Sequence, residues 1–441
     1  MRSATRIYSV WNRLNYGNNS PLLRAAMLSG TDCNLYVITG VPVYDLRGKL
    51  YWDDVWELDV IARLPFWKKI ALISPVRNLT ELGPTLVDFP SESIQLFGVD
   101  GNKPVPIQRL QVKRLLRRLL GDEVGFYEFA GTSSLGKYGF RFAVREGETK
   151  RIITFDAPIE LTKIQIYSQK ALTSLWKKIV APFYLLYEAH FRSWAVRHAM
   201  AVLVVGDGIV EELSVKKDCV HKIISAPLSL DKEEEMLSTE QFEEFWRAKA
   251  KKTRFTIMCA DRLASEKGVF ELVKAIERRS SREEGTADAV LHLYSSGPSK
   301  EDILSYVCQR KLSRLVTYAG KVSRNELIES MRKCDLFVTL TKTLDFNRTM
   351  IEAAGQGCAI VGSNLPGPKS FFKHADSAWL VDPTNPDEIC MAIDYLLVNF
   401  CERKRIARTA LLVAKGNSAE KVKARIMNWY LTRFIELDSN Q

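Results

Sequence analysis

The spacing of apolar residues along the chain predicts alternating strands and helices. Short, continuous apolar runs rich in β-branched residues predict strands, and segments with apolar residues three or four positions apart predict amphipathic helices. In the first half, the predicted strands are residues 6–11, 35–39, 69–74, 151–155, 201–205 and 223–225. In the second half, they are residues 255–260, 290–294, 315–318, 336–340, 359–362 and 378–381, with helices at 269–278, 324–332 and 385–398.

Continuous apolar strands that alternate with helices are typical of parallel sheets covered on both faces. Two such series predict an α/β protein with two Rossmann-like domains. We place the N-terminal domain at residues 1–231, an acidic linker or insertion at 232–252, the C-terminal domain at 253–401 and terminal helices at 402–441. Residues 75–150 are less regular, and the run 124–144 suggests hairpins.

The composition is that of a folded soluble protein, with 441 residues of which 46% are hydrophobic and 26% are charged. The longest uncharged apolar run, residues 179–187, is far shorter than the roughly 18 residues of a membrane span. Two charges precede any apolar segment at the N-terminus, so we expect no signal peptide and a cytoplasmic protein. The eight cysteines contain no CxxC pair, and we expect them to be reduced, buried and unconnected to any metal or cofactor.

The formal net charge of +11 favours anionic partners, and residues 106–120 concentrate it in one predicted helix. Its leucine side holds Val112, Leu115, Leu116 and Leu119, and its opposite side holds Lys113, Arg114, Arg117 and Arg118. Such a helix either rests on an anionic membrane at the inner face of the cell or packs its leucines inward and leaves a solvated basic face. The aromatic residues of the next long helix are expected in the core: Trp176, Phe183, Tyr184, Phe191 and Trp194.

The segment 255–276, FTIMCADRLASEKGVFELVKAI, carries the most specific chemistry. A predicted strand is followed by Arg262 and Lys267, and Gly268 begins a helix. Two cations beside a helix N-terminus can bind a diphosphate through side chains and backbone N–H groups. The alternative is an ordinary loop with solvated charges.

This segment resembles the donor-phosphate loop of family 4 glycosyltransferases, which have the GT-B fold. Further strings resemble the motifs of that family in the same order: LHLYSSGP at 291–298, VTYAGKV at 316–322, CDLFV at 334–338, IEAAGQG at 351–357, LPG at 365–367 and LVDP at 380–383. The likeness covers residues 253–400. It is fainter in the first half, at NYGNN (15–19) and at residues 188–207 and 226–231.

The resemblance implies two Rossmann-like domains facing each other across a cleft. It implies transfer of a sugar from a nucleotide-diphosphate donor to a hydroxyl of a glycan or lipid-linked acceptor, with retention of configuration and without a metal. Arg262 and Lys267 would bind the departing diphosphate, and Glu352 would bind the ribose, although a first-turn glutamate also complements a helix dipole. The full donor-binding set is Gly17, Gly297, Lys321, Val322, Asp345, Phe346, Asn347, Arg348, Thr349 and Glu352.

Two positions depart from the family pattern. Leu344 stands where a first glutamate would hold sugar hydroxyls, so either Asp345 replaces it, the sugar is held differently, or activity is lost. Asp156 stands where many members have a histidine, and it either assists catalysis or forms a turn before Pro158. An epimerase, a nucleic-acid glucosyltransferase and a non-enzymatic scaffold therefore stay open, although we do not expect nucleic acid as a partner.

Overall fold

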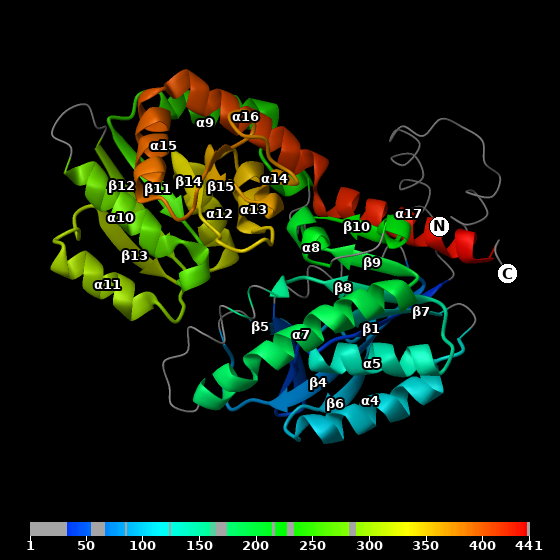
Figure 1. Ribbon diagram of the computed structural model, residues 1–441. Coiled ribbons are helices and arrows are strands. Elements are labelled where there is room, and N and C mark those ends of the chain that lie inside the picture. The colour runs from blue at the N-terminus through cyan, green and yellow to red at the C-terminus, as the bar shows by residue number, and fades with distance from the viewer. Residues whose placement is uncertain are drawn as a thin grey trace, which may run out of the picture.

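The structure, a computed structural model, describes residues 33–53, 67–83, 86–122, 125–159, 161, 163, 174–213, 217–226, 233–281 and 288–438. These residues form two α/β units, each built on one large sheet (Figure 1). The predicted strand 6–11 and Gly17 lie outside the described residues.

The N-terminal sheet has ten strands among the described residues, in the order β10-β9-β8-β7-β1-β4-β2-β3-β5, with β6 paired to β4. The other five predicted strands are present, and the sheet is parallel except where β3 runs antiparallel to β2 and β5. Its strands are β1 (Asn34–Ile38), β2 (Val43–Leu46), β3 (Lys49–Asp53), β4 (Lys69–Asn78), β5 (Leu86–Asp88), β6 (Ile94–Asp100), β7 (Gly125–Ala130), β8 (Arg151–Phe155), β9 (Ala201–Val204) and β10 (Ile223–Ser225).

Three long helices lie on one face of this sheet: α4 (Val105–Leu119), α5 (Ser134–Arg145) and α7 (Ser174–His198). The short α8 (Asp207–Glu212) and the 3-10 helix η2 (Lys217–Lys222) follow β9. The hairpins suggested for residues 124–144 are wrong, because this run forms β7 followed by α5, whose first turn is capped by the Ser133 hydroxyl. That cap, three residues after a strand, was the missed signal for a strand-to-helix connection.

The expectation that the aromatic residues of α7 form core is partly wrong. Phe191 is fully buried, as predicted, but Phe183 is 75% exposed and Tyr184 is 40% exposed. The helix register explains this exposure. The buried side of α7 holds Ala181, Glu188 and Arg192, and Phe183 lies on the opposite side.

The C-terminal sheet is fully parallel, in the order β13-β12-β11-β14-β15-β16. All six predicted strands are present: β11 (Arg254–Cys259), β12 (Asp288–Tyr294), β13 (Val316–Gly320), β14 (Leu336–Thr339), β15 (Ile360–Ser363) and β16 (Trp379–Val381). Numbered within the domain, the order is 3-2-1-4-5-6, the Rossmann arrangement, whose ligand crevice opens where the strand order reverses. That point lies between β11 and β14.

Helices cover both faces of this sheet. They are η4 (Ser265–Lys267), α10 (Val269–Ser280), α11 (Lys300–Gln309), α12 (Arg324–Lys333), α13 (Thr349–Gly355), α14 (Pro366–Lys369) and α15 (Pro386–Val398). The acidic segment before β11 forms η3 (Glu233–Glu235) and α9 (Thr239–Lys249). Helix α9 packs on this domain, because Trp246 is fully buried and donates its indole N–H to the Gly357 carbonyl at 3.1 Å.

The last two helices connect the domains. Helix α16 (Phe400–Gly416) packs against α13 and α15, and α17 (Ala419–Asp438) returns to the N-terminal sheet (Figure 1). There Val422, Ile426 and Met427 join a core cluster that includes Leu35 of β1. None of the described helices is long and apolar enough to span a membrane.

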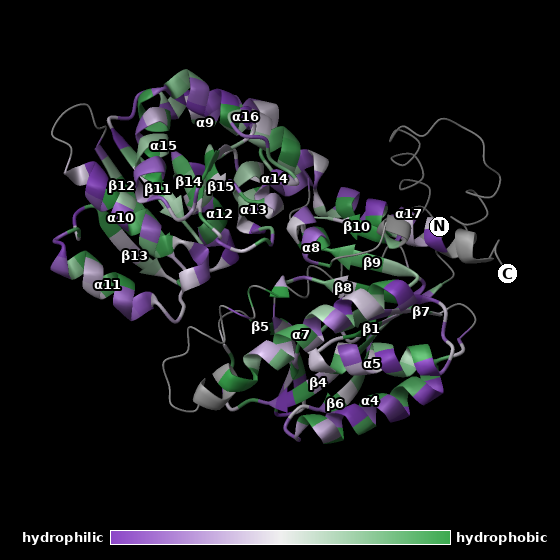
Figure 2. Cartoon of the chain, in the orientation of Figure 1, coloured by the Kyte–Doolittle hydropathy of each residue, from purple (hydrophilic) through white to green (hydrophobic). Residues whose placement is uncertain are grey.

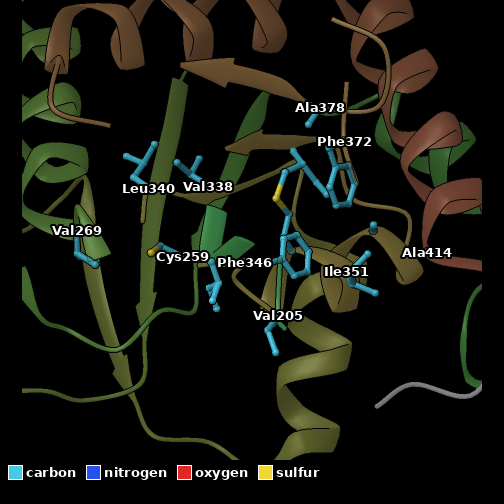
Figure 3. Close-up of a cluster of buried hydrophobic side chains, with 14 of the residues drawn as sticks. Val205, Cys259, Val269, Val338, Leu340, Phe346, Ile351, Phe372, Ala378 and Ala414 are labelled. Atoms are coloured by element: carbon cyan, nitrogen blue, oxygen red, sulfur yellow. The ribbon is translucent and has the colours of Figure 1, made fainter. Parts of the chain in front are cut away.

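The domains also meet at the carboxyl ends of their strands. Val205, which follows β9, shares a core cluster with Phe346 of the loop after β14, and Figure 3 shows Phe346 between Val205 and Phe372. The backbone N–H of Asp207 donates to the Ser370 hydroxyl at 2.8 Å. The loops that follow the strands of one domain therefore face those of the other.

The expectation of buried cysteines holds for six of the eight. Cys308 and Cys401 are exposed, because each lies on the outer side of a surface helix. All eight are free thiols.

Candidate active site

The loop after β11 lies at the strand-order reversal of the C-terminal sheet. It carries Asp261, Arg262 and Lys267 and ends at Gly268, whose φ of 62° begins α10. A methyl group at Gly268 would overlap the Leu340 carbonyl oxygen. The Lys342 N–H donates to the Glu266 carbonyl at 2.8 Å. Glycine therefore lets the loops after β11 and β14 pack directly on each other.

The two predicted phosphate-binding cations each have a carboxylate partner. Lys267 Nζ lies 3.7 Å from Asp345 Oδ2, and the Lys267 side chain is only 16% exposed. Arg262 donates to the buried Glu266 carboxylate, but its own side chain is half exposed. The structure thus places Arg262 and Lys267 on one loop, and Lys267 against Asp345 of the facing loop.

Asp261 is a site residue that the sequence reasoning missed. Its side chain is buried and accepts hydrogen bonds from the Asn347 amide and, at 3.1 Å, from the Thr349 hydroxyl. Burial raises the pKa of Asp261, while Lys267 and these hydrogen bonds act in the opposite direction. A carboxylate directly after a buried strand, at the predicted ligand edge of the sheet, was the available signal.

Hydrogen bonds between buried polar side chains hold the loop after β14 in place. The Asn347 amide also donates to the Thr339 hydroxyl at 2.7 Å, and Thr343 donates to Asp345. Asp345, Phe346 and Asn347 are each less than 10% exposed. This loop is therefore fixed in place by its own buried hydrogen bonds.

Glu352 lies in α13 at the same edge and is nearly buried. Its Oε1 lies 3.2 Å from Arg348 Nε and 3.7 Å from Arg324 Nη1. Two guanidinium groups therefore lie against this carboxylate.

Gly297, Lys321 and Val322 follow β12 and β13 and so lie at the same edge of the sheet. The loop after β12 packs closely on Leu263, since the Ser299 N–H donates to the Leu263 carbonyl at 2.8 Å. A side chain at Gly297 would therefore overlap the Leu263 backbone. Lys321 is exposed and lies three residues before Arg324. The predicted donor-binding residues of the C-terminal domain thus share one edge.

Asp156 belongs to the N-terminal domain, directly after β8. It is exposed and accepts a hydrogen bond at 2.6 Å from Thr132, which follows the neighbouring strand β7. It therefore stands at the carboxyl edge of its own sheet, and this hydrogen bond lies within the N-terminal domain. Gly17 lies outside the described residues, and its role in donor binding stays a prediction.

Leu344, at the first departure from the family pattern, lies in the contact between domains. A methyl group at Gly208 would approach within 2.8 Å of Leu344 Cβ, and one at Gly367 would overlap the Asp345 backbone. Position 344 therefore packs against the first turn of α8.

The comparison with solved structures shows the fold. HepE of Anabaena, solved in complex with UDP, aligns over 93% of this chain and all of its own, with a TM-score of 0.62 and 14% identity. Sucrose-phosphate synthase of Thermosynechococcus elongatus aligns over 92% of this chain and all of its own, with a TM-score of 0.65 and 12% identity. The chain has the GT-B fold.

The comparison with protein families agrees with this fold. Residues 240–412 match the family model described as glycosyl transferases group 1. An uncharacterized glycosyltransferase of Methanocaldococcus jannaschii is 25% identical over 35% of this chain and 38% of its own. The GtfA subunit of a UDP-N-acetylglucosamine–peptide N-acetylglucosaminyltransferase of Streptococcus agalactiae is 23% identical over 44% of this chain and 36% of its own.

The matches to these two relatives span less than two fifths of the relatives' length. The predicted resemblance to group 1 glycosyltransferases is confirmed, and the GT-B fold with it. Assignment to family 4 in particular stays a prediction.

Proposed function

We propose that this GT-B protein is a glycosyltransferase that moves a sugar from a nucleoside-diphosphate donor to a hydroxyl acceptor. The observation that supports this most is the gathering of Arg262, Lys267, Asp345 and Glu352 at the strand-order reversal of the C-terminal sheet. In addition, HepE has been solved with UDP-glucose, and the pneumococcal GtfA with UDP and GlcNAc.

The donor diphosphate would exchange places with the carboxylates that now face the two cations. The 3.7 Å separation of Lys267 and Asp345 is a loose ion pair, and the half-exposed Arg262 side chain can turn toward a ligand. A diphosphate offers more charge and more acceptor oxygens than either carboxylate. It is therefore expected to compete well for both cations.

In the reaction, the bond from the anomeric carbon to the diphosphate oxygen breaks and a bond from the same carbon to the acceptor oxygen forms. The proton of the acceptor hydroxyl passes to the departing diphosphate or to a nearby base such as Asp156. Arg262 and Lys267 stabilise the charge that develops on the diphosphate, which is an electrostatic role. We propose that configuration is retained and that no metal is needed.

Glu352 would bind the ribose hydroxyls, with Arg348 and Arg324 holding its carboxylate in place. The buried loop of residues 345–349 would position the phosphate and sugar. Because Leu344 packs against α8, Asp345 is the nearest carboxylate on this loop for the sugar hydroxyls. The acceptor is proposed to be a glycan or a lipid-linked sugar bound on the N-terminal side.

The experiment is a product assay with a panel of nucleotide sugars and hydroxyl acceptors, analysed by mass spectrometry and by NMR of the anomeric proton. A new glycoside with the donor's configuration is expected. Isomerised donor without a glycoside would indicate an epimerase. Donor binding without any turnover would indicate a scaffold, and either result would overturn the proposal.

A further inference from the structure

The first half of α7 presents large apolar side chains to solvent. Phe183 is 75% exposed and Leu186 is 70% exposed, and Ile179 and Val180 are each more than half exposed. These positions are separated by one, three, four, six or seven residues, so they share one side of the helix. We call Ile179, Val180, Phe183 and Leu186 the α7 apolar face. An exposed apolar face of this kind marks a binding surface.

The charges of the three neighbouring helices are almost entirely of one sign. Helices α4, α5 and α7 lie side by side on one face of the sheet (Figure 1), and the Arg141 guanidinium of α5 lies 5.1 Å from the Tyr187 ring of α7. They contain five, three and four Lys or Arg residues respectively. Their one carboxylate, Glu188, is buried and paired with Lys137.

Helices α4 and α5 carry five exposed cations, which together are called the α4–α5 basic face: Arg109, Arg114, Arg117, Arg118 and Arg145. Figure 2 shows hydrophilic residues along much of α4 and hydrophobic segments in the first half of α7.

The apolar side of α4 is not available to a partner. Val112 and Leu116 are fully buried, and Leu115 and Leu119 are partly buried against the core. The leucines predicted for membrane contact therefore pack inward, which is the alternative that the sequence left open. Among the described residues of the three helices, the exposed large apolar side chains are those of α7 together with Val105, Ile107 and Leu110 at the start of α4.

We propose that the α7 apolar face and the α4–α5 basic face together bind the surface of an anionic lipid bilayer. A bilayer satisfies both features, because headgroup phosphates pair with the arginines and the acyl boundary accepts Phe183 and Leu186. A nucleic acid would use the charges but leave the aliphatic side chains in water. A second copy of this chain would bring another set of cations against the first.

The test is sedimentation of the full chain with vesicles of phosphatidylcholine mixed with phosphatidylglycerol, and with vesicles of phosphatidylcholine alone. Binding is expected to the anionic vesicles and to weaken as salt is raised. The double substitution F183S/L186S should weaken binding at least about tenfold. The double substitution R114Q/R118Q should weaken it about fivefold for each charge removed.

Matched controls lie in the C-terminal domain. Leu412 of α16 is 65% exposed, so L412S removes an equally exposed apolar side chain. K311Q/R314Q removes two exposed cations. Both controls should bind vesicles as the wild type does.

Four outcomes would overturn the proposal. The first is equal binding to both vesicle types, and the second is equal weakening by the controls. The third is a loss of thermal stability or of dimerisation in F183S/L186S with unchanged vesicle binding, since the face would then be covered by this chain or by a second copy. The fourth is tighter binding to duplex DNA than to the anionic vesicles. Vesicle binding does not depend on catalysis, so failure here leaves the proposed function untouched.

Discussion

The two domains share a parallel-sheet core but place their charges differently. In the C-terminal domain, cations such as Lys267 and Arg348 stand at the carboxyl ends of strands, each beside a carboxylate. In the N-terminal domain, cations such as Arg114 and Arg118 stand on α4, which like its neighbour α5 contains no carboxylate. Paired charges at a sheet edge suit a small anionic ligand, and a broad surface of one sign suits an extended one.

The largest contrast between the regions concerns aromatic side chains. Phe337 of β14 is completely buried, so Phe337→Ala should lower the free energy of unfolding by about 3–5 kcal/mol. Phe183→Ala should change it by less than about 0.5 kcal/mol, because the side chain is 75% exposed. Urea unfolding followed by circular dichroism measures both. A large loss in Phe183→Ala would mean that the Phe183 side chain is itself part of a core.

A smaller effect is expected where the domains meet. Gly208→Ala would bring a methyl group against Leu344, and relieving that overlap should cost about 1–3 kcal/mol. We expect the two domains to separate slightly, with a larger radius of gyration by small-angle X-ray scattering and slower transfer. Gly416→Ala is the control, because a methyl group there meets nothing within 4 Å. Identical behaviour of the two variants would contradict the described contact.

The smallest predicted effect is a pH dependence. Burial raises the pKa of Asp261 above its ordinary value, so the folded state binds more protons than the unfolded state and ionisation costs stability as pH rises. Asp261→Asn removes that cost, so its stability relative to the wild type should improve as the pH rises above the ordinary aspartate value, for example between about pH 4 and about pH 8.

Unfolding curves at the two pH values measure this difference. Asp288→Asn is the control, because the Asp288 side chain is 59% exposed. A stability difference between Asp261→Asn and wild type that stays constant with pH would show that the Asp261 carboxyl does not titrate in this range.

The six strands of the C-terminal domain could all be predicted from the sequence because they are continuous apolar runs. Of these, β11 and β14 were placed within one residue at each end. The antiparallel pair β2 and β3 was missed, because its turn uses Arg47 and Gly48 at positive φ rather than an Asn-Gly signal.

The candidate site could also be predicted only in part from the sequence. The sequence predicted Arg262 and Lys267 from their spacing, but it could not show that Glu266 and Asp345 lie against them. Asp261 was missed because its partners Asn347 and Thr349 are more than eighty residues away in the chain. Contacts across the sheet edge depend on strand order, which local pattern does not specify.

The most direct measurement is the affinity of Lys267→Ala and Arg262→Ala for the donor. It is measured by thermal shift or calorimetry with the nucleotide sugar that stabilises the wild type most. Arg314→Ala is the control, because this exposed cation of the same domain lies at the opposite, amino end of β13. We predict at least about tenfold weaker binding in both loop variants, or about 1.4 kcal/mol, and wild-type binding in the control. Wild-type affinity in both Lys267→Ala and Arg262→Ala would contradict the proposed diphosphate site.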